Sequence, residues 1–597
     1  MKLQNMKNRI AVALSALATI LAPLLWGGIG GGLLTSCNDL DELPDNRTEI
    51  DHVEKVQLLL TSAYPNSVPA VICELSSDNL VDNNVVLNAT HNSAYAKFHE
   101  EAYKWEDINN YSLGEQDTPY QVWEEYYYGI AECNHAIAAM EQMSPNPKDD
   151  PELRHSWGEA HVLRAYLHFV LLNVFAESYK DEAQSAIDLG IPYVTKPEEV
   201  VSVDYSQSEY RKSVAETYRL IESDILEGID LIDDSKYKVP AYHFNRNAAN
   251  AFAARFYLFW RKYEECKKYA NAALGSSPSS ILRNWNTISQ NTMDSRLLGY
   301  NDEKAACNFL MQTTYSLQDR MLSACRYCIN QGYSWGKWNS RDSLRLKAMG
   351  IRGEVPQVQD ALKVIYAGGG PNWGGYLPAY NGNFFIFGRQ EYGIWLFRVY
   401  EYFEYTDKIA GIGYVHMIYQ PFTAEETLLC LAEAKLYTEG YQAAINDLGL
   451  WTAGKGVARA LTYENIGKFY AGTAATNDFV SDIHPKEMGF EKNYLDTLKN
   501  DTCRNVLQCI LHFRRIETMF EGMRWFDIKR YGITVHHAYR GPAEDDPTHD
   551  YLLWNDKRRV LQLPNNVVTA GFEPIDRGVT HNVDGSLQTK PIPYSTN

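Results

Sequence analysis

The sequence predicts a mainly α-helical protein whose helices pair into hairpins and are interrupted by long loops. Apolar residues recur at spacings of three and four over several segments of more than ten residues. Two pairs of such segments share one layout: a helix of small residues, a turn, and a helix that begins with an aromatic residue. Between Pro278 and Pro421 this periodicity stops. Long loops are therefore expected to leave a helical spine there.

The first helices are expected early in the chain. The segment 123–143 has one apolar face, formed by Tyr126, Ile130, Cys133, Ile137 and Met140. This spacing is typical of an amphipathic helix. Two prolines then interrupt the pattern, and a second helix is expected from about residue 152 to 175.

Two later helix pairs show the repeated layout. The segments 247–260 and 263–274 form one pair, which Gly275 is expected to end. The segments 424–438 and 441–448 form the other, with a turn at Gly440. This layout is similar to a tetratricopeptide repeat, in which two helices meet through alanine and glycine. The units are irregularly spaced, so the prediction is a tetratricopeptide-like spine with long inserted loops.

The region after the second pair differs in composition. From residue 373 to 405, 13 of 33 residues are Phe, Trp or Tyr, and no single helical or strand period fits. Partly exposed loops with short strands or helices are expected, and the tail after Tyr531 is expected to end without a helix. The two parts, about 37–280 and 281–597, are expected to fold as one unit.

The N-terminus has the features of a cleaved secretory signal. Three basic residues precede an uncharged run from residue 10 to 36, which ends in Leu-Thr-Ser before Cys37. This junction resembles a bacterial lipoprotein box, in which the cysteine is acylated, for example with palmitate, and becomes the new N-terminus. The alternative is an uncleaved signal anchor, since the run is long enough to span a bilayer. Five glycines between residues 27 and 32 disfavour a helix there.

The charge of the chain disfavours two classes of partner. Without the predicted signal of residues 1–36, 53 basic and 75 acidic residues give a net charge of −22. A surface of this sign repels nucleic acid and anionic lipid. Anchoring is therefore expected to depend on acyl chains at Cys37, and acidic residues directly after it resemble the surface-export signal of some Gram-negative lipoproteins.

Motifs for catalysis, metals and cofactors are weak. The ten cysteines are sparse, and the pair Cys325 and Cys328 has no second pair at zinc-binding spacing. Gly332-Tyr-Ser334-Trp-Gly336 matches the nucleophile elbow, but the preceding residues suggest a helix rather than the required strand. The glycine run at 368–370 lacks the Gly-Lys-Ser/Thr of a phosphate loop. We therefore predict no catalytic residue, no metal and no cofactor. The acidic residues 544–546 are expected to form a solvated loop, and a calcium site there is the alternative.

A family resemblance covers the predicted mature chain. Residues 513–532, Phe-Arg-Arg-Ile-Glu-Thr-Met-Phe-Glu-Gly-Met-Arg-Trp-Phe-Asp-Ile-Lys-Arg-Tyr-Gly, resemble the C-terminal signature of the SusD/RagB family. Other landmarks follow in the family's order: residues 37–44, Trp123 to Asn134, Leu163 to Tyr166, Gly190 to Tyr193, Ala432 to Ala434 and Pro591-Ile592-Pro593. Polar residues 588–590 before the last motif depart from the apolar residues of many members.

The resemblance implies a function. Members are surface lipoproteins of the outer membrane that face the exterior and deliver nutrients to a SusC-like, TonB-dependent transporter without catalysing a reaction. A glycan, oligosaccharide or polysaccharide, is therefore the expected ligand. A peptide ligand is one alternative. A helical-repeat scaffold that holds envelope proteins together without a small ligand is another.

The signature is expected to be structural. On one helix, Ile516, Met519, Phe520, Met523 and Phe526 would form an apolar stripe. Three pairs of opposite charges lie three residues apart: Arg514 with Glu517, Glu521 with Arg524, and Asp527 with Arg530. The alternative is that Arg524 or Glu521 contacts a ligand.

Aromatic residues in loops are the candidate ligand contacts. Sugars present an apolar face and a polar rim, so a sugar site needs flat, exposed rings with hydrogen-bonding neighbours. The candidates are Tyr95 and Trp105 (with Tyr103) in an early loop, Trp335 and Trp338, and Trp373 with Tyr376. The alternative is that these rings lie in the core. Trp373 is the strongest candidate, because the two glycines that follow it allow a ligand to approach closely.

Overall fold

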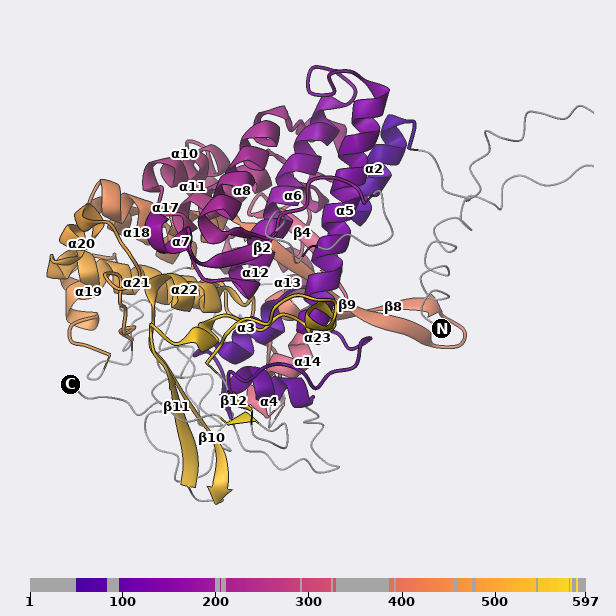
Figure 1. The fold of residues 1–597 in the computed structure, drawn as a ribbon. Coiled ribbons are helices and arrows are strands. Elements are labelled where there is room, and N and C mark those ends of the chain that lie inside the picture. The colour runs from indigo at the N-terminus through magenta and orange to yellow at the C-terminus, as the bar shows by residue number, and fades with distance from the viewer. Residues whose placement is uncertain are drawn as a thin grey trace, which may run out of the picture. The chain divides into compact units, whose positions relative to one another are not determined.

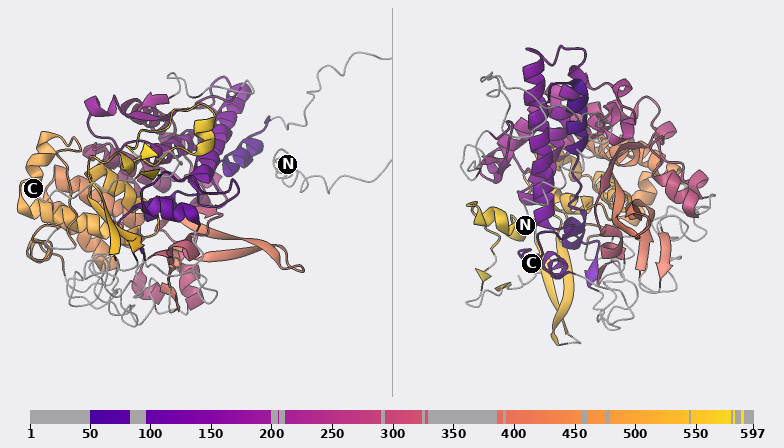
Figure 2. Two further views of the ribbon diagram at one scale, coloured as in Figure 1. Left: turned by 60° about the horizontal axis from the view of Figure 1, so that its bottom comes forward. Right: turned by 90° about the vertical axis from the view of Figure 1, so that its right-hand side faces the viewer.

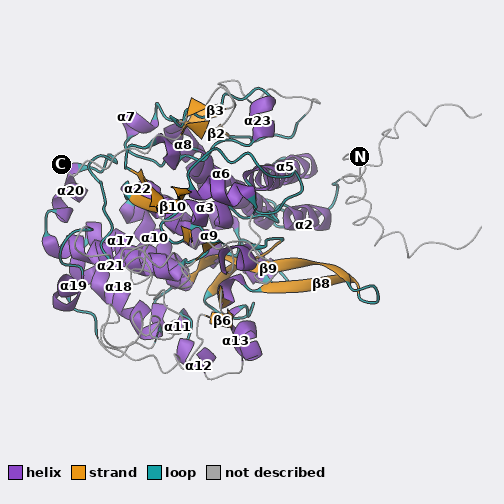
Figure 3. Cartoon of the chain, turned by 90° about the horizontal axis from the view of Figure 1, so that it is seen from below, coloured by secondary structure: helices purple, strands orange, loops and turns teal. Residues whose placement is uncertain are grey.

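Helices make up most of the part of the chain that the structure, a computed structural model, describes (Figure 3). Residues 50–597 group into one unit, apart from residues 1–49. The sheets of the described part are small, with two or three strands each. The predicted mainly α-helical class is confirmed. The described residues are 50–82, 96–198, 205, 211–289, 293–323, 326–328, 386–390, 393–455, 460–474, 479–543, 546–578, 580–581 and 587–588.

Helices form most of the N-terminal part, and those of ten or more residues stack side by side (Figure 1). They are α2 (Val53–Ser62), α3 (Ala70–Ser76), α4 (Lys97–Tyr103), α5 (Pro119–Met143), α6 (Arg154–Phe175), α7 (Glu182–Ser185) and α8 (Val214–Gly228), with the short strands β2 (Leu189–Pro192) and β3 (Arg211–Ser213) before α8. The Thr118 side chain caps α5 ahead of a proline at its first position. Helices α6 and α8 approach closely at Gly158, where a Cβ would lie 2.7 Å from the Gly228 carbonyl oxygen.

Two further helical hairpins extend the stack. They are α9 (Arg246–Phe259) with α10 (Tyr263–Leu274), and α17 (Ala424–Thr438) with α18 (Tyr441–Gly454). Gly275 and Gly440 adopt positive φ of 68° and 91° at the predicted stop and turn. Helix α10 packs against α17 although about 150 residues separate them. The hairpins therefore stack as tetratricopeptide-like units, as the sequence predicts.

The inserted region contains short elements, as expected. They are α11 (Pro278–Ile281), α12 (Trp285–Ser289), α13 (Met293–Tyr300), α14 (Gln318–Ser323), β4 (Asn308–Thr314), β5 (Tyr327–Cys328), β6 (Ile386–Gln390), β7 (Gly393–Leu396), β8 (Glu401–Asp407) and β9 (Ile412–Thr423). Strands β4, β9 and β8 form an antiparallel sheet in that order. The β8–β9 hairpin projects away from the helices (Figures 1 and 2).

The C-terminal signature differs from the prediction of one helix. After α19 (Tyr463–Phe469) and α20 (Lys492–Leu498), it occupies two helices, α21 (Asp501–Glu517) and α22 (Met523–Tyr531). The chain turns between them, where Phe520 and Gly522 have φ of 68° and 78°. A Cβ on Gly522 would lie 3.0 Å from the Ala70 Cα of α3, so this turn needs glycine.

The tail is more ordered than the sequence suggested. It forms a long hairpin of β10 (Val535–Ala543) and β11 (Asp546–Leu552), then the short helix α23 (Asn565–Thr569) and the strands β12 (Thr580–His581) and β13 (Leu587–Gln588). The hairpin was missed because its residues are largely polar and include Pro542 and Pro547, which disfavour a strand assignment.

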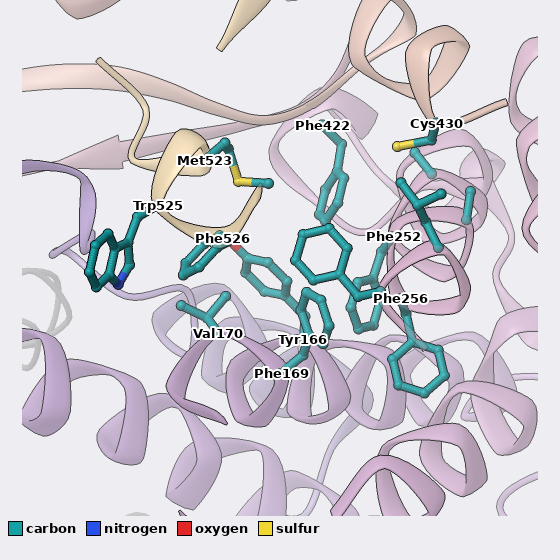
Figure 4. Close-up of a cluster of buried hydrophobic side chains, with 14 of the residues drawn as sticks. Tyr166, Phe169, Val170, Phe252, Phe256, Phe422, Cys430, Met523, Trp525 and Phe526 are labelled. Atoms are coloured by element: carbon teal, nitrogen blue, oxygen red, sulfur yellow. The ribbon is translucent and has the colours of Figure 1, made fainter. Parts of the chain in front are cut away.

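Aromatic side chains from distant elements form the centre of the core (Figure 4). The Tyr166 ring of α6 lies 5.6 Å from that of Phe252 in α9 and 5.5 Å from that of Phe422 in β9, both edge to face. Met523 and Phe526 of α22 face the same cluster. This edge-to-face packing favours one arrangement of α6, α9, β9 and α22.

Buried ion pairs hold α17, α21 and α22 together. The Arg514 guanidinium, fully buried, lies 3.1 Å from Glu426 and 3.2 Å from Asp527. Arg530 binds Asp527 at 2.7 Å and also binds both oxygens of Glu433. The predicted local pair of Asp527 with Arg530 is confirmed. The predicted partners of Arg514 and Arg524 are wrong. Arg514 binds Glu426 and Asp527 although Glu517 lies on the same helix. The turn at residues 518–522 separates Glu521 from α22, and Arg524 binds Asp78.

Glu433→Gln is expected to lower the free energy of unfolding by about 3 kcal/mol or more, because the buried Arg530 then keeps only the Asp527 carboxylate, which Arg514 also binds. Denaturant unfolding monitored by circular dichroism measures this. Lys499→Gln is the control, since its pair with Asp496 is exposed, and it should change stability by less than about 1 kcal/mol. Equal stability of the two variants would contradict the argument.

Candidate functional site

Two loop segments start from neighbouring strands. Strand β1 (Val81–Asp82) pairs antiparallel with β5, with Val81 opposite Cys328 and Asp82 opposite Tyr327. The chain continues from β1 into residues 83–95 and from β5 into residues 329–385. These two segments contain five of the six predicted ligand aromatics. The β1–β5 pair is therefore the described base of the candidate site.

This base is fixed by buried polar contacts. Arg326 donates two hydrogen bonds of 2.7 Å to the Asp82 carboxylate, whose side chain is fully buried. The Tyr103 hydroxyl accepts from the Asp82 backbone N–H and donates to the Ala538 carbonyl oxygen, both at 3.1 Å. Bidentate guanidinium–carboxylate pairs restrict orientation as well as distance. Strand β1 is thus held by contacts with Arg326, next to β5, and through Tyr103 with β10.

Trp105 is part of this base and not of an exposed face, which corrects the prediction. Its side chain is fully buried, and its indole N–H donates to the Ser76 carbonyl oxygen at 2.8 Å. The Trp105 backbone has a φ of 53°, and its carbonyl oxygen accepts from Arg577 at 3.0 Å. This unusual conformation turns the indole inward. Tyr103, named with it, is also fully buried.

The other predicted site residues lie outside the described residues. They are Cys37, Tyr95, Trp335, Trp338, Trp373 and Tyr376. Their roles in acylation and ligand contact stay predictions. The serine motif at Ser334, the glycine run at 368–370 and Cys325 also lie outside the described residues.

The charged residues of the signature are engaged in the fold. Arg524 is 1% exposed and binds both Asp78 carboxylate oxygens at 2.8 Å. Burial raises the pKa of Glu521 to about 7, and Arg398 lies 3.1 Å from its carboxylate. These contacts support the structural role that was predicted for the signature over ligand contact.

Comparisons with known proteins agree with this arrangement. Residues 39–258 match the SusD-like family model described as "Starch-binding associating with outer membrane". A SusD-like protein of Formosa agariphila is 30% identical over 198 residues, 33% of this chain. The chain spans about a third of the length of that curated relative. Over residues 39–258 the chain is thus similar to SusD-like proteins.

Solved structures of SusD-like proteins share the fold. One from Bacteroides fragilis has a TM-score of 0.53 at 16% identity, with 90% of this chain and 100% of that chain covered. A protein of Bacteroides vulgatus described as sugar binding has a TM-score of 0.52 at 15% identity, with 89% and 99% covered. At these identities the likeness shows the fold alone.

The described part of the chain has several free cysteines whose side chains are buried. It has no group of three or more His, Cys, Asp and Glu side chains that could hold a metal ion. Its acid–histidine contacts include buried pairs such as His161 with Asp224, which Arg164 also binds. Burial raises the pKa of the Cys307 thiol to about 11. No helix of this part has the length and apolar composition to cross a membrane.

Two exposed aromatic residues were not singled out from the sequence. Phe403 and Tyr405 of β8 are 47% and 52% exposed, with ring centroids 4.8 Å apart. They lie within the aromatic-rich segment 373–405 that the sequence identified. Their alternate spacing, which places both on one face of a strand, was the available signal.

Trp105→Ala is expected to lower the free energy of unfolding by about 3 to 5 kcal/mol, the usual cost of removing a buried aromatic side chain. Thermal unfolding measures this. Tyr405→Ala is the control and should change stability by about 0.5 kcal/mol or less, because the ring is half exposed. If Trp105→Ala leaves the melting temperature unchanged and weakens ligand binding, Trp105 would be a ligand contact and not a core residue.

Proposed function

We propose that this protein is an acylated outer-membrane lipoprotein that faces the exterior, binds a nutrient glycan and delivers it to a TonB-dependent transporter. The observation that carries the proposal is the β1–β5 pair, from which the two segments with Tyr95 and with Trp335 to Tyr376 continue. The family description supports a carbohydrate as the ligand class, since it names starch binding and the outer membrane.

The chemistry of the candidate residues supports a sugar. Tryptophan and tyrosine rings offer flat apolar faces for the C–H face of a sugar ring, and polar neighbours can bind its hydroxyls. Trp373, followed by Gly374 and Gly375, remains the preferred contact, with Tyr376, Trp335, Trp338 and Tyr95 as further candidates. The proposal assigns binding and no catalysis to these residues.

A glycan panel tests this proposal. The full chain is expected to bind at least one oligosaccharide, measured by calorimetry, and Trp373→Ala is expected to weaken binding by at least about 1 kcal/mol, roughly fivefold in Kd, through loss of a stacking ring. Its melting temperature should stay nearly unchanged.

Trp554→Ala is the matched control, since Trp554 is 37% exposed and, in the sequence, follows β11 and belongs to neither segment. It should leave the affinity unchanged. Binding of peptides instead of glycans would favour a peptide-binding member of the family. If the chain binds neither glycans nor peptides but other envelope proteins are purified together with it, a scaffold role would be favoured.

The partnership with a transporter is inferred from a physical requirement as well as from the family resemblance. A protein tethered by lipid cannot move its cargo through a membrane, so uptake requires a channel beside it. Holding ligand at the mouth of a transporter raises the local ligand concentration. No interface for this partner is assigned here.

Cys37→Ala is expected to release the protein from the outer membrane, because acyl chains supply its anchoring. Membrane fractionation and mass spectrometry of the N-terminal peptide measure this. If the variant stays on the cell surface by itself, an uncleaved signal anchor is the better explanation.

Affinity purification of the native chain from membranes dissolved in mild detergents is expected to recover the transporter. Recovery of the lipoprotein alone would count against the partnership.

A further inference from the structure

His537 of β10 is a fully buried histidine with two carbonyl partners. Its Nδ1 lies 2.6 Å from the Tyr103 carbonyl oxygen, and its Nε2 lies 2.8 Å from the Ser77 carbonyl oxygen. Carbonyl oxygens only accept hydrogen bonds, so both ring nitrogens must donate. A neutral imidazole donates from one nitrogen only, whereas the positively charged imidazolium donates from both.

Aromatic rings cover both faces of His537. The Tyr103 ring is 4.1 Å away at an interplanar angle of 2°, and the Trp105 ring is 4.1 Å away at 12°. Electron-rich faces on both sides favour a cation. Burial alone disfavours charge, but the two carbonyls and the two rings compensate for the lost water. In the neutral form, one nitrogen lone pair would face a carbonyl oxygen at less than 3 Å.

A charged cluster that includes Asp550, on the paired strand, also favours the imidazolium. Asp550 of β11 lies directly opposite His537 in the strand pairing. Asp550 and Asp556 share the single guanidinium of Arg558, so this cluster keeps one net negative charge. Arg558 itself lies 5.4 Å over the Trp105 ring.

Other charged groups on the surrounding elements are mostly paired with one another. The ion pairs are Asp82 with Arg326, Asp78 with Arg515 and Arg524, Glu100 with Lys104, and Asp107 with Arg577. The other acidic groups on these elements are Glu74 in α3, and Glu101 and Glu106 in and after α4.

We propose that His537 is held as an imidazolium and acts as a pH-sensitive clamp that positions the β1–β5 base. Its two N–H groups join β10 to residue 77, ahead of β1, and to residue 103, whose hydroxyl binds the Asp82 N–H. Loss of one proton removes one hydrogen bond and the cation–π contacts. The clamp itself stands on these contacts; its effect on ligand binding rests on the proposed function.

The sign of the pH dependence follows from proton linkage. A histidine in an unfolded chain releases its proton near pH 6.5. The clamp keeps that proton to higher pH in the folded protein. Its stabilisation is therefore complete below about pH 6.5 and is lost as the pH rises through the point where folded His537 deprotonates.

Nitrogen-15 NMR of the full chain labelled at histidine tests the charge directly. At pH 8 ordinary histidines are neutral, so one doubly protonated ring is expected among the 15 histidines and should vanish in His537→Gln. Absence of such a ring in the native chain at pH 7 to 8 would overturn the proposal. This result needs no variant, so a failure of His537→Gln to fold leaves the test decisive.

Unfolding measured against pH tests the clamp. Above about pH 6.5, the unfolding equilibrium constant of the native chain should rise by up to about tenfold per pH unit relative to His537→Gln. His536→Gln, the neighbouring histidine on the same strand, is the matched control and should keep this slope. A native slope equal to that of His537→Gln would refute the clamp.

Ligand binding separates the clamp from the proposed function. Affinity for a glycan found in the panel should weaken over the same pH range in the native chain. Unchanged affinity, despite the NMR and unfolding results, would remove the positioning role. Failure to bind any glycan at any pH would count against the proposed function and leave the clamp intact.

Discussion

Burial of the charged C-terminal signature is the constraint on which the rest of the fold depends. Arg514, Asp527 and Arg530 are almost completely removed from water. Both arginines bind Asp527, and they also bind Glu426 and Glu433 of α17. A buried charge without a partner is strongly destabilising. Only the arrangement that brings α17, α21 and α22 together satisfies all of these charges. The stacking of the repeat hairpins is thus tied to the last helices of the chain.

The same signature connects the C-terminal helices to the base of the candidate site. Arg515 binds Asn79 at 2.8 Å, Arg524 binds Asp78, and the Gly522 N–H donates to Glu74 at 3.0 Å. These contacts span more than 430 residues of sequence. Strand β1 begins two residues after Asn79, so these contacts hold the residues that lead into β1. A rigid base suits a binding site, because less order is lost when a ligand binds.

Aromatic residues serve two purposes in this chain. Trp105 and Tyr103 stack on His537 inside the protein, whereas Phe403 and Tyr405 stand in solvent on a projecting hairpin. Ring type and loop position do not distinguish these cases, since both occur in segments without a clear period. The difference for Trp105 comes from its positive φ and from Arg577, which binds its carbonyl oxygen. Both depend on residues distant in the sequence.

The sequence by itself determined the helices of the repeats, the glycines that end or join them, and the pair of Asp527 with Arg530. All of these depend on neighbours within about four residues, where periodicity and capping act. Tertiary structure alone decided the break between α21 and α22, the partners of Arg514 and Arg524, the burial of Trp105 and the β10–β11 hairpin. Most of these depend on groups far apart in the sequence, such as Arg524 with Asp78 and Trp105 with Arg577. The hairpin pairs neighbouring strands, but His537 joins it to Tyr103 and Ser77. Which distant groups meet is set by satisfying buried charges and filling one core together, and no local pattern encodes that.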